Sequence, residues 1–488
     1  KLGTSAGKRA AFRCLMSDIP VTYDHIQHEG QAGRMGTRLM AIVAEGLQGR
    51  VYITPTEEHE TVALLSQPEW QPQIELPNNT RDFKTPKYGL QSFGDLFTAR
   101  QLVALKTFSD LVQEAREHVK SDAISGGMND DDMGQDSDGV GATAYSDAVA
   151  VYLGFLVNQV ANHSSSVCGW NAANAQMRSV FARQAIQMVW DYAESNPFCD
   201  SSGSFNNLFN RQIKGFEALG HGCYGVASQA DAAHQSLSLG KVVCTDPPYY
   251  DNIGYADLSD FFYIWLRRSL RIVFPSLFAT LTVPKVEELI ASPYRQGTKE
   301  KAQTFFLDGM TRSMGRLADQ AHPGFPVTVF YAFKQSETKG EAGIISTGWS
   351  SFIEALKYSK FTITGTWPVR TEKTGRTISI GTNSLASSII LVCRPREAHA
   401  STSTRREFLA ALRTDLPKAV GKFQQSGIAP VDLAQAAIGP GMAVFTRYSN
   451  VLNASGEPMS VREALGIINE TLYEVLAEQH GEFDSDTR

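Results

Sequence analysis

The tetrapeptide Asp-Pro-Pro-Tyr at residues 246–249 places a carboxylate, two rigid residues and an aromatic ring directly after an apolar stretch. That stretch, KVVCT at residues 241–245, predicts a buried strand. Pro247 and Pro248 restrict φ and lack N–H donors, so their carbonyl groups are held in place without backbone pairing of their own. Together with Asp246 and the ring of Tyr249, these carbonyl groups suit a planar ligand that carries an NH₂ group.

An amino group at this position can be held at both of its hydrogens. The Asp246 carboxylate and the Pro247 carbonyl each accept one N–H, while the ring of Tyr249 offers a stacking surface. Accepting both hydrogens directs the nitrogen lone pair toward an electrophile. The amine of a nucleobase and the methyl group of S-adenosylmethionine form such a pair of reactants. A base must leave its duplex stack to reach the site. The transfer itself needs no metal. The alternative is a proline turn that only ends a strand.

From residue 223 onward, predicted strands alternate with predicted helices. We expect strands at residues 223–228, 241–245, 326–333, 361–367 and 387–393, and helices at 258–270, 299–321 and 349–358. This alternation predicts a mostly parallel sheet with helices on both faces, which is an α/β fold. Only a loop joins the last two strands, so they should pair antiparallel at the edge. Asp246 then lies at the carboxyl end of a strand, where open α/β sheets bind ligands.

The other segments are predicted to be mainly helical. Apolar spacing predicts a strand at residues 50–55, helices at 95–117, 148–160 and 174–194, and a final helix that a capping box at Ser460 and Glu463 opens. Residues 121–142 contain six Asp and no Lys or Arg, so we expect a solvated, flexible loop there. The spacing of these Asp residues does not match a calcium-binding loop, which needs Gly at its sixth position and Glu at its twelfth.

The composition is that of an ordinary globular protein. The 488 residues are 42% hydrophobic and 20% charged, and the net charge is −6. This length predicts two or three structural units, and no run of about 18 apolar residues occurs. The six cysteines are scattered without a CxxC pair, which predicts reduced thiols in a cytoplasmic protein and neither a disulfide framework nor a complete zinc ribbon.

Several longer stretches resemble a single protein family. They are DPPYYDNIGYADLSDFFYIWLRRSL, LFATLTVPKVEELIASPYRQGTKEKA, YAFKQSE, GTNSLASSIILVCRPR and IGPGMAVFTRY. These stretches resemble large bacterial and archaeal adenine-specific DNA methylases, in which a zinc-ribbon insert separates two halves of the catalytic domain. Members of that family are often linked to phage defence. Asp in the first position of the tetrapeptide is similar to adenine-N6 enzymes, whereas cytosine-N4 enzymes typically have Ser there.

The resemblance covers nearly the whole chain and implies a Rossmann-like, S-adenosylmethionine-dependent methyltransferase sheet with added helical segments. It implies methyl transfer to N6 of adenine in double-stranded DNA, with Asp246, Pro247, Pro248 and Tyr249 as catalytic residues and Asp246 also near the cofactor. The expected parts are an N-terminal mixed segment (1–120), an acidic loop (121–146), a catalytic region (147–400) and a C-terminal helical region (401–488).

The chain departs from that family in its N-terminal part. The Gly-rich loop for S-adenosylmethionine should lie upstream of the zinc ribbon, and the sequence contains no such loop after a predicted strand. Cys14 and Ser17 resemble a remnant of the ribbon's last Cys pair, with Ser17 where a second Cys is expected. We therefore expect the C-terminal portion of a methylase, with the N-terminal half supplied elsewhere or lost.

Three further residues are candidates for the cofactor or the target base. Asp231 follows the predicted strand at 223–228, and the resemblance implies that such an acid accepts a hydrogen bond from the amino group of the cofactor's adenine. The alternative is a helix cap or a loop acid. Tyr250 and Asn252 are candidates for shaping the pocket of the target base, although Tyr250 could instead pack on the sheet.

Basic and core candidates complete the sequence predictions. The loop between the last two strands has candidates for phosphate contacts, with ordinary solvation as the alternative: Arg370, Lys373 and Arg376. A second basic group is explained by the dipole at a helix C-terminus: Arg267, Arg268 and Arg271. Cys244 and Trp367 are expected in the core, with the base pocket as the alternative for Trp367.

Three functions remain open from the sequence. The first is an adenine-N6 DNA methyltransferase or its catalytic part. The second is another amino-methyltransferase, acting on cytosine N4 or on protein glutamine. The third is a DNA-binding subunit of a defence system without catalytic activity, whose cofactor site is incomplete.

Overall fold

The computed structural model describes residues 12–219, 225–251, 253–331, 347–370, 387–425 and 430–480. The fold is mixed α/β, and the chain divides into two compact units. The first unit comprises Lys1–Tyr224 and Tyr255–Val286, and the second comprises Gly225–Gly254 and Glu287–Arg488. The segment that contains Asp246 therefore belongs to the second unit. None of the helices in the described ranges has the length and apolar character needed to cross a bilayer.

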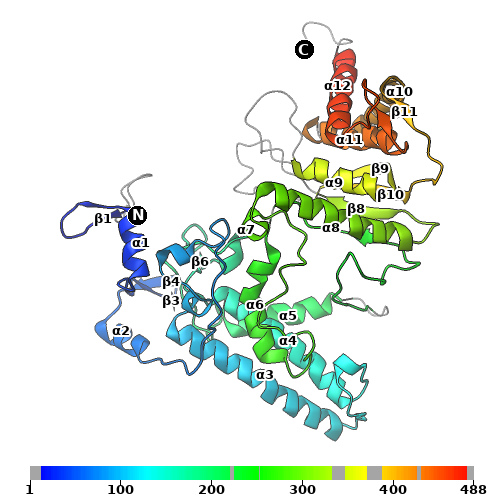
Figure 1. Ribbon diagram of the computed structural model, residues 1–488. Helices are drawn as coiled ribbons and strands as arrows, with labels where there is room; N and C mark the ends of the chain where they lie inside the picture. The colour runs from blue at the N-terminus through cyan, green and yellow to red at the C-terminus, as the bar shows by residue number, and fades with distance from the viewer. Residues whose placement is uncertain are drawn as a thin grey trace. The chain divides into compact units, whose positions relative to one another are not determined.

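The first unit is mainly helical (Figure 1). Its α-helices are α1 (Tyr23–Gln31), α2 (Glu57–Leu64), α3 (Ala99–Ser125), α4 (Ala142–His163), α5 (Phe205–Glu217) and α6 (Tyr255–Leu270). Its 3₁₀ helices are η1 (Thr85–Tyr88), η2 (Gly94–Leu96), η3 (Gln135–Ser137) and η4 (Val180–Ala182). Its strands form antiparallel pairs, namely β1 (Phe12–Arg13) with β2 (Pro20–Val21), β3 (Ile42–Gly46) with β4 (Gly49–Ile53), and β5 (Trp170–Asn171) with β6 (Gln176–Met177). The helices predicted at 148–160 and 258–270 are confirmed as α4 and α6.

Helix α3 begins later than the pattern predicted, because a capping box sets its first residue. The Thr98 side chain accepts a hydrogen bond from the Gln101 N–H, and the Gln101 side chain accepts one from the Thr98 N–H. This reciprocal pair satisfies two backbone donors that would otherwise lack partners at the helix N-terminus. The helix that we predicted over 95–117 therefore runs over Ala99–Ser125.

The acidic loop between α3 and α4 has defined hydrogen bonds, whereas the sequence predicted a solvated, flexible segment. The Asp130 carboxylate accepts hydrogen bonds from the N–H and the hydroxyl of Thr143, at 3.0 and 2.9 Å. Asp131 accepts one from the Val140 N–H at 3.0 Å. These bonds stabilise the charged form, so the pKa of Asp130 lies well below its ordinary value, with the Thr143 N–H as the largest cause.

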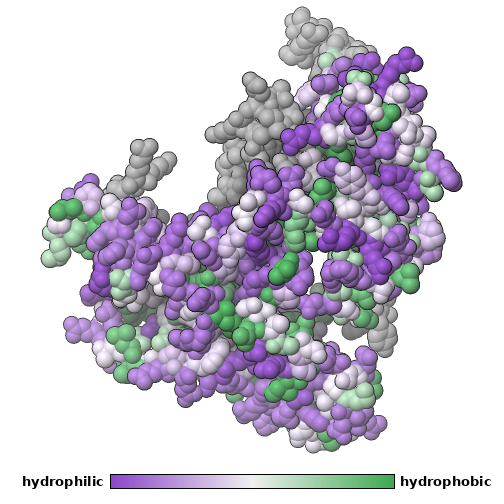
Figure 2. All heavy atoms as spheres, viewed as in Figure 1, coloured by the Kyte–Doolittle hydropathy of each residue, from purple (hydrophilic) through white to green (hydrophobic). Residues whose placement is uncertain are grey.

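The stretch from Cys14 to Ser17, the expected ribbon remnant, forms the turn of the β1–β2 hairpin. A hydrogen bond from the Ser17 side chain lowers the pKa of the Cys14 thiol. Leu15 and Met16 are 87% and 94% exposed, and Figure 2 shows apolar surface at this hairpin. Ser17 therefore stands beside the Cys14 sulfur as a hydrogen-bond donor, where a second thiolate was expected.

The helix predicted over 174–194 is wrong. These residues contain the short elements β6 and η4, and Ile186 and Tyr192 form bridges to Phe83 and Gly169. Ile186 donates its N–H to the Asp82 carbonyl at 2.8 Å and accepts a hydrogen bond from the Lys84 N–H at 3.0 Å. Since these bonds use backbone groups that a helix would need, tertiary pairing overrides the local helix propensity.

The second unit contains a four-stranded sheet with the order β7-β8-β10-β9. Its strands are β7 (Cys244–Thr245), β8 (Val327–Tyr331), β9 (Phe361–Arg370) and β10 (Ser387–Pro395), with a separate parallel pair of β11 (Ser403–Thr404) and β12 (Val451–Leu452). Its helices are α7 (Pro293–Gln296), α8 (Lys299–Gln320), α9 (Thr347–Tyr358), α10 (Arg405–Gln425), α11 (Pro430–Thr446) and α12 (Val461–His480). β7 is parallel to β8, and β10 is antiparallel to both β8 and β9. The predicted antiparallel pairing of the last two strands is confirmed. The mostly parallel sheet that we predicted is wrong for the described strands, because only β7 and β8 pair in parallel.

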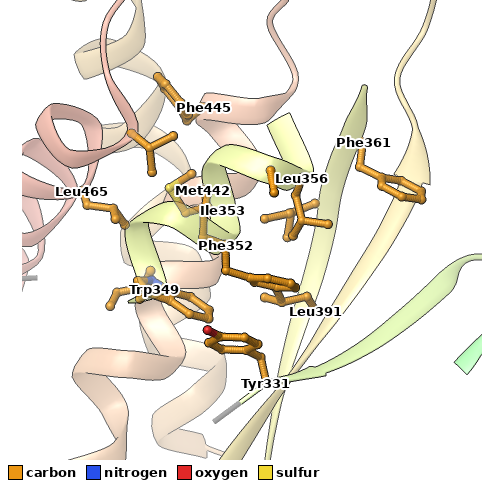
Figure 3. Close-up of a cluster of buried hydrophobic side chains, with 14 of the residues drawn as sticks. Tyr331, Trp349, Phe352, Ile353, Leu356, Phe361, Leu391, Met442, Phe445 and Leu465 are labelled. Carbon is orange, nitrogen blue, oxygen red and sulfur yellow. The ribbon is translucent and has the colours of Figure 1, made fainter. Parts of the chain in front are cut away.

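The core of the second unit lies between the sheet and its helices. In Figure 1 the strands run between α8 and the C-terminal helices α11 and α12. β8 buries its alternate residues Val327, Val329 and Tyr331, as expected for a strand with one buried face. Figure 3 shows the rings of Trp349 and Phe352, on α9, directed at Tyr331.

Lys357, near the end of α9, is buried and forms no ion pair with any residue in the described part of the chain. Its ammonium lies 3.4 Å from the Met459 carbonyl oxygen and 4.8 Å from the centre of the Phe445 ring. Burial lowers the pKa of Lys357, and repulsion from Arg396 adds to this effect. The unfolded chain therefore binds this proton more tightly than the folded chain does.

We expect Lys357→Met to raise the free energy of unfolding by about 1 kcal/mol at pH 7, because it removes a buried charge that lacks an anionic partner. In the wild type, the loss of stability caused by the buried charge should diminish as the pH rises from the lowered pKa of Lys357 in the folded chain toward its ordinary value of about 10.4 in the unfolded chain. Urea unfolding of both proteins between pH 7 and pH 10 measures the difference. If the difference in free energy of unfolding between variant and wild type grew with pH, or if the variant were less stable at pH 7, Lys357 would not be a destabilising buried charge.

Candidate functional site

Strand β7 places Asp246 at the carboxyl end of a parallel strand pair. Cys244 and Thr245 pair with Thr328 and Val329 of β8, and Asp246 is the next residue of the chain. Its side chain is exposed and makes no ion pair with any residue in the described ranges. In open α/β sheets, ligands bind beyond the carboxyl ends of the strands.

The residues after Asp246 form a tight turn that is held from several sides. Pro247 is buried, and the Pro248 carbonyl accepts the Tyr250 N–H at 3.2 Å. Tyr250 has a φ of 46°, which is uncommon for an aromatic residue. Its carbonyl accepts the Ala291 N–H at 2.9 Å, and its buried ring meets Phe306 at 5.1 Å. Tyr250 thus packs into the core and does not line the site, while Asn252 lies outside the described residues.

Tyr249 contacts Asp246 through its hydroxyl group. The hydroxyl donates a hydrogen bond to Asp246 Oδ1 at 2.7 Å. The half-buried ring meets Tyr331 edge to face, with ring centres 5.2 Å apart. Tyr331 in turn stacks on Phe352 at 4.2 Å (Figure 3). Sequence reasoning expected a stacking surface at Tyr249 and did not predict its bond to the carboxylate.

A cavity of about 230 Å³ lies beside Asp246. Four segments of the second unit line it. They are the strand end with Thr245, Asp246, Pro247 and Pro248, the turn with Ala232 and Gln235, the loop residue Leu289, and a largely apolar face of α8 with Met310, Ser313, Met314 and Leu317. Asp246 is the only charged residue among them. The cavity therefore combines apolar walls with one carboxylate, which suits a planar, largely apolar group with a donor at its edge.

The wall from α8 was missed by sequence reasoning. The helix itself was predicted over 299–321, and it runs over Lys299–Gln320. Its lining residues 310, 313, 314 and 317 follow helical spacing, so they share one face. The hydroxyl of buried Ser313 donates to the Gly309 carbonyl at 3.0 Å, which satisfies its donor within the helix. The run of Met and Leu at this spacing was the available signal, but the same pattern is typical of an ordinary core face.

Asp231 lies in the turn beside the cavity, but its carboxylate is used within that turn. It accepts a hydrogen bond from the Ala233 N–H at 2.8 Å and lies 2.7 Å from His234 Nδ1. These contacts lower the pKa of Asp231, with His234 as the largest cause. This geometry is that of the loop acid that the sequence left open as the alternative, although the neighbours of Asp231 do line the cavity.

The strand predicted before Asp231 is wrong in its described part. Residues 223 and 224 lie outside the described ranges, and residues 225–230 are exposed and form no strand. Val226 is 93% exposed, so its β-branched side chain has no sheet to pack against. β7 is accordingly an edge strand among the described strands, which leaves Cys244 exposed rather than buried.

The predicted basic contacts are only partly visible. Arg370 is the last residue of β9, while Lys373 and Arg376 lie outside the described residues. Trp367 is 57% exposed on β9, so its expected place in the core is wrong. In the first unit, the Arg267 side chain donates to the Thr280 carbonyl at 2.9 Å, and Arg268 donates to Asp110 at 2.6 Å. Both arginines have structural partners there.

Asp246 and the α8 wall thus line one cavity, and Tyr249 bonds to Asp246 without lining the cavity itself. No family model, no curated protein and no solved structure matches the chain. What this site does must therefore be inferred from its own side chains.

Proposed function

We propose that the second unit holds the adenine of a DNA duplex for methylation at N6. The observation that carries this proposal is the exposed carboxylate of Asp246, which lines a cavity of about 230 Å³ and has no cationic partner in the described part of the chain. A purine presents an apolar ring with an amine at its edge. The apolar wall and the single acceptor group match those two features.

The residues of the chain would act on the amine by orienting it. The Asp246 carboxylate has a second oxygen besides the one that Tyr249 contacts, and that oxygen can accept one N–H of the amine. The Pro247 carbonyl is the second acceptor that we assign. With both hydrogens held, the nitrogen lone pair points away from the plane of the ring. An N–C bond would form there as the S–C bond of S-adenosylmethionine breaks, and the amine would lose one proton to solvent by way of the Asp246 carboxylate. Met310 and Met314 would contact the ring, since thioether sulfur packs favourably against aromatic groups.

The described residues do not form a complete site for S-adenosylmethionine. The cavity is smaller than the range of about 300–1,000 Å³ that is typical of pockets for larger ligands. The carboxylate of Asp231, the expected contact of the cofactor's adenine, is used by Ala233 and His234. On this proposal, the methyl donor is held at least partly beyond the described residues, in this chain or in a partner. We assign the cavity to the acceptor base.

Duplex DNA is the substrate class that we propose, and the target adenine must leave its stack to enter the cavity. Flipping a base costs a few kcal/mol, which contacts with the apolar wall would partly offset. The parallel pair β7–β8, extended by antiparallel β10 and β9, is compatible with part of a doubly wound sheet that ends in an antiparallel edge. We infer a Rossmann-like methyltransferase sheet on that basis.

Incubation of the chain with methyl-labelled S-adenosylmethionine and unmethylated genomic DNA tests the proposal. After digestion to nucleosides, we expect the label on N6 of deoxyadenosine. Label on cytosine or on protein would support another amino-methyltransferase instead. DNA binding without any label would support a non-catalytic subunit. Genomic DNA is the appropriate substrate because it contains every short recognition sequence.

A further inference from the structure

The contact between Tyr249 and Asp246 has the geometry of a strong hydrogen bond. The hydroxyl lies 2.7 Å from Asp246 Oδ1, which is within the short range of bonds from a hydroxyl to a charged carboxylate. Asp246 is exposed, so solvent alone would leave its side chain free to occupy several rotamers. Among the described residues, Tyr249 is the hydrogen-bond partner that the carboxylate has.

The ring of Tyr249 packs against a cluster of buried aromatic rings. It meets Tyr331, which is 2% exposed and stacks on fully buried Phe352 with an interplanar angle of 11°. The ring of Trp349 also contacts the ring of Tyr331, with ring centres 5.6 Å apart (Figure 3). Moving the Tyr249 ring would disturb this packed cluster, so packing fixes its hydroxyl beside the exposed carboxylate of Asp246.

We propose that Tyr249 is a positioning residue whose hydroxyl orients Asp246, so that the second carboxylate oxygen faces the cavity. This role rests on the proposed function, and it differs from a role of Tyr249 as a stacking surface for the base. A stacking surface needs only the ring, which phenylalanine retains. A positioning role needs the hydroxyl, which phenylalanine lacks. The variant Tyr249→Phe therefore separates the two roles.

We expect Tyr249→Phe to lower kcat for adenine methylation by about 10- to 100-fold, because misplacing a reacting group by about 1 Å can have an effect of this size. KM for DNA should change less than about threefold, since the ring and the cavity walls remain. The matched control is Tyr358→Phe on α9. Tyr358 is exposed and also donates to a carboxylate, Glu354 Oε1 at 3.0 Å, but this carboxylate does not line the cavity, whereas that of Asp246 does. This control should retain the kcat of the wild type.

A kcat of Tyr249→Phe equal to that of the wild type would overturn the positioning role while leaving the proposed function in place. A second measurement tests the bond without any turnover. Thermal unfolding of Tyr249→Phe, Asp246→Ala and the double variant should show non-additive shifts in Tm, because either change breaks the same bond. Additive shifts would also overturn the proposal. A wild type that methylates no adenine would contradict the proposed function and this role with it, and coupled shifts would then establish only a structural bond.

Discussion

Asp246→Ala is expected to abolish adenine methylation, with a loss of at least about 10³-fold in kcat. The substitution removes the acceptor that we assign to the amine, which is the only charged group among the described residues that line the cavity. Positioned acid–base groups contribute about 10²–10⁴-fold to catalysis, and the orientation of the amine depends on the same carboxylate. Asp246→Asn retains one acceptor oxygen but loses the charge, so its activity should fall less. Transfer of label to N6 of deoxyadenosine measures both variants.

The fold of the Asp246 variants should remain intact. Asp246 is exposed and has no ion pair with the described residues, so its loss removes little more than one hydrogen bond, worth about 1 kcal/mol. Asp308→Ala is the matched control, because Asp308 is an exposed aspartate of the same unit that does not line the cavity. It should retain full activity. Near-normal adenine methylation by Asp246→Ala would rule out the mechanism.

Gly439→Ala is expected to lower the free energy of unfolding by about 2–3 kcal/mol, the cost of overpacking a dense core. A Cβ atom at residue 439 would lie 1.9 Å from Thr366 Cγ2 and 2.1 Å from its Oγ1. Thr366 is buried on β9, and its hydroxyl donates to the Ala436 carbonyl of α11 at 3.2 Å. Its β-branched side chain cannot rotate away without losing that bond. The close approach of α11 to the sheet thus requires glycine at this position.

Gly466→Ala on α12 provides the control. A Cβ there would have no atom within 4 Å, so the substitution changes only backbone entropy. Alanine should stabilise this helix by about 0.5–1 kcal/mol. Urea unfolding followed by circular dichroism compares the two variants with the wild type. If Gly439→Ala is as stable as Gly466→Ala, the packing of α11 against β9 differs from that described.

Elements with a strong apolar period were predicted correctly. The helices α4, α6, α8 and α9 and the strands β8, β9 and β10 lie close to their predicted ranges. The antiparallel pairing of β9 with β10 also followed from the short connection between them. Most of these elements bury one face, and a buried face leaves a periodic pattern in the sequence. β10 instead buries every residue from Ser388 to Cys393, and such a strand has a continuous apolar run.

The errors occur where distant segments decide the outcome. Residues 174–194 have helical spacing, yet Ile186 pairs with the backbone around Phe83. Residues 225–228 have the composition of a strand, yet no described strand lies beside them. Trp367 is exposed because it faces the side of β9 opposite to Thr366, which packs against α11, and Cys244 is exposed on an edge strand among the described strands. Local composition contains no information on whether a partner is present.

For the candidate site, the sequence by itself determined the turn that follows β7. A carboxylate, two prolines and a tyrosine after a strand specify a turn at the carboxyl end of β7, because proline geometry and strand direction are local properties. The tertiary structure alone decided that α8 forms the opposite wall, that Tyr250 turns into the core, and that the Tyr249 hydroxyl meets Asp246. Contacts between residues such as Asp246 and Met314 depend on how the sheet and α8 pack, and packing is a property of the whole core.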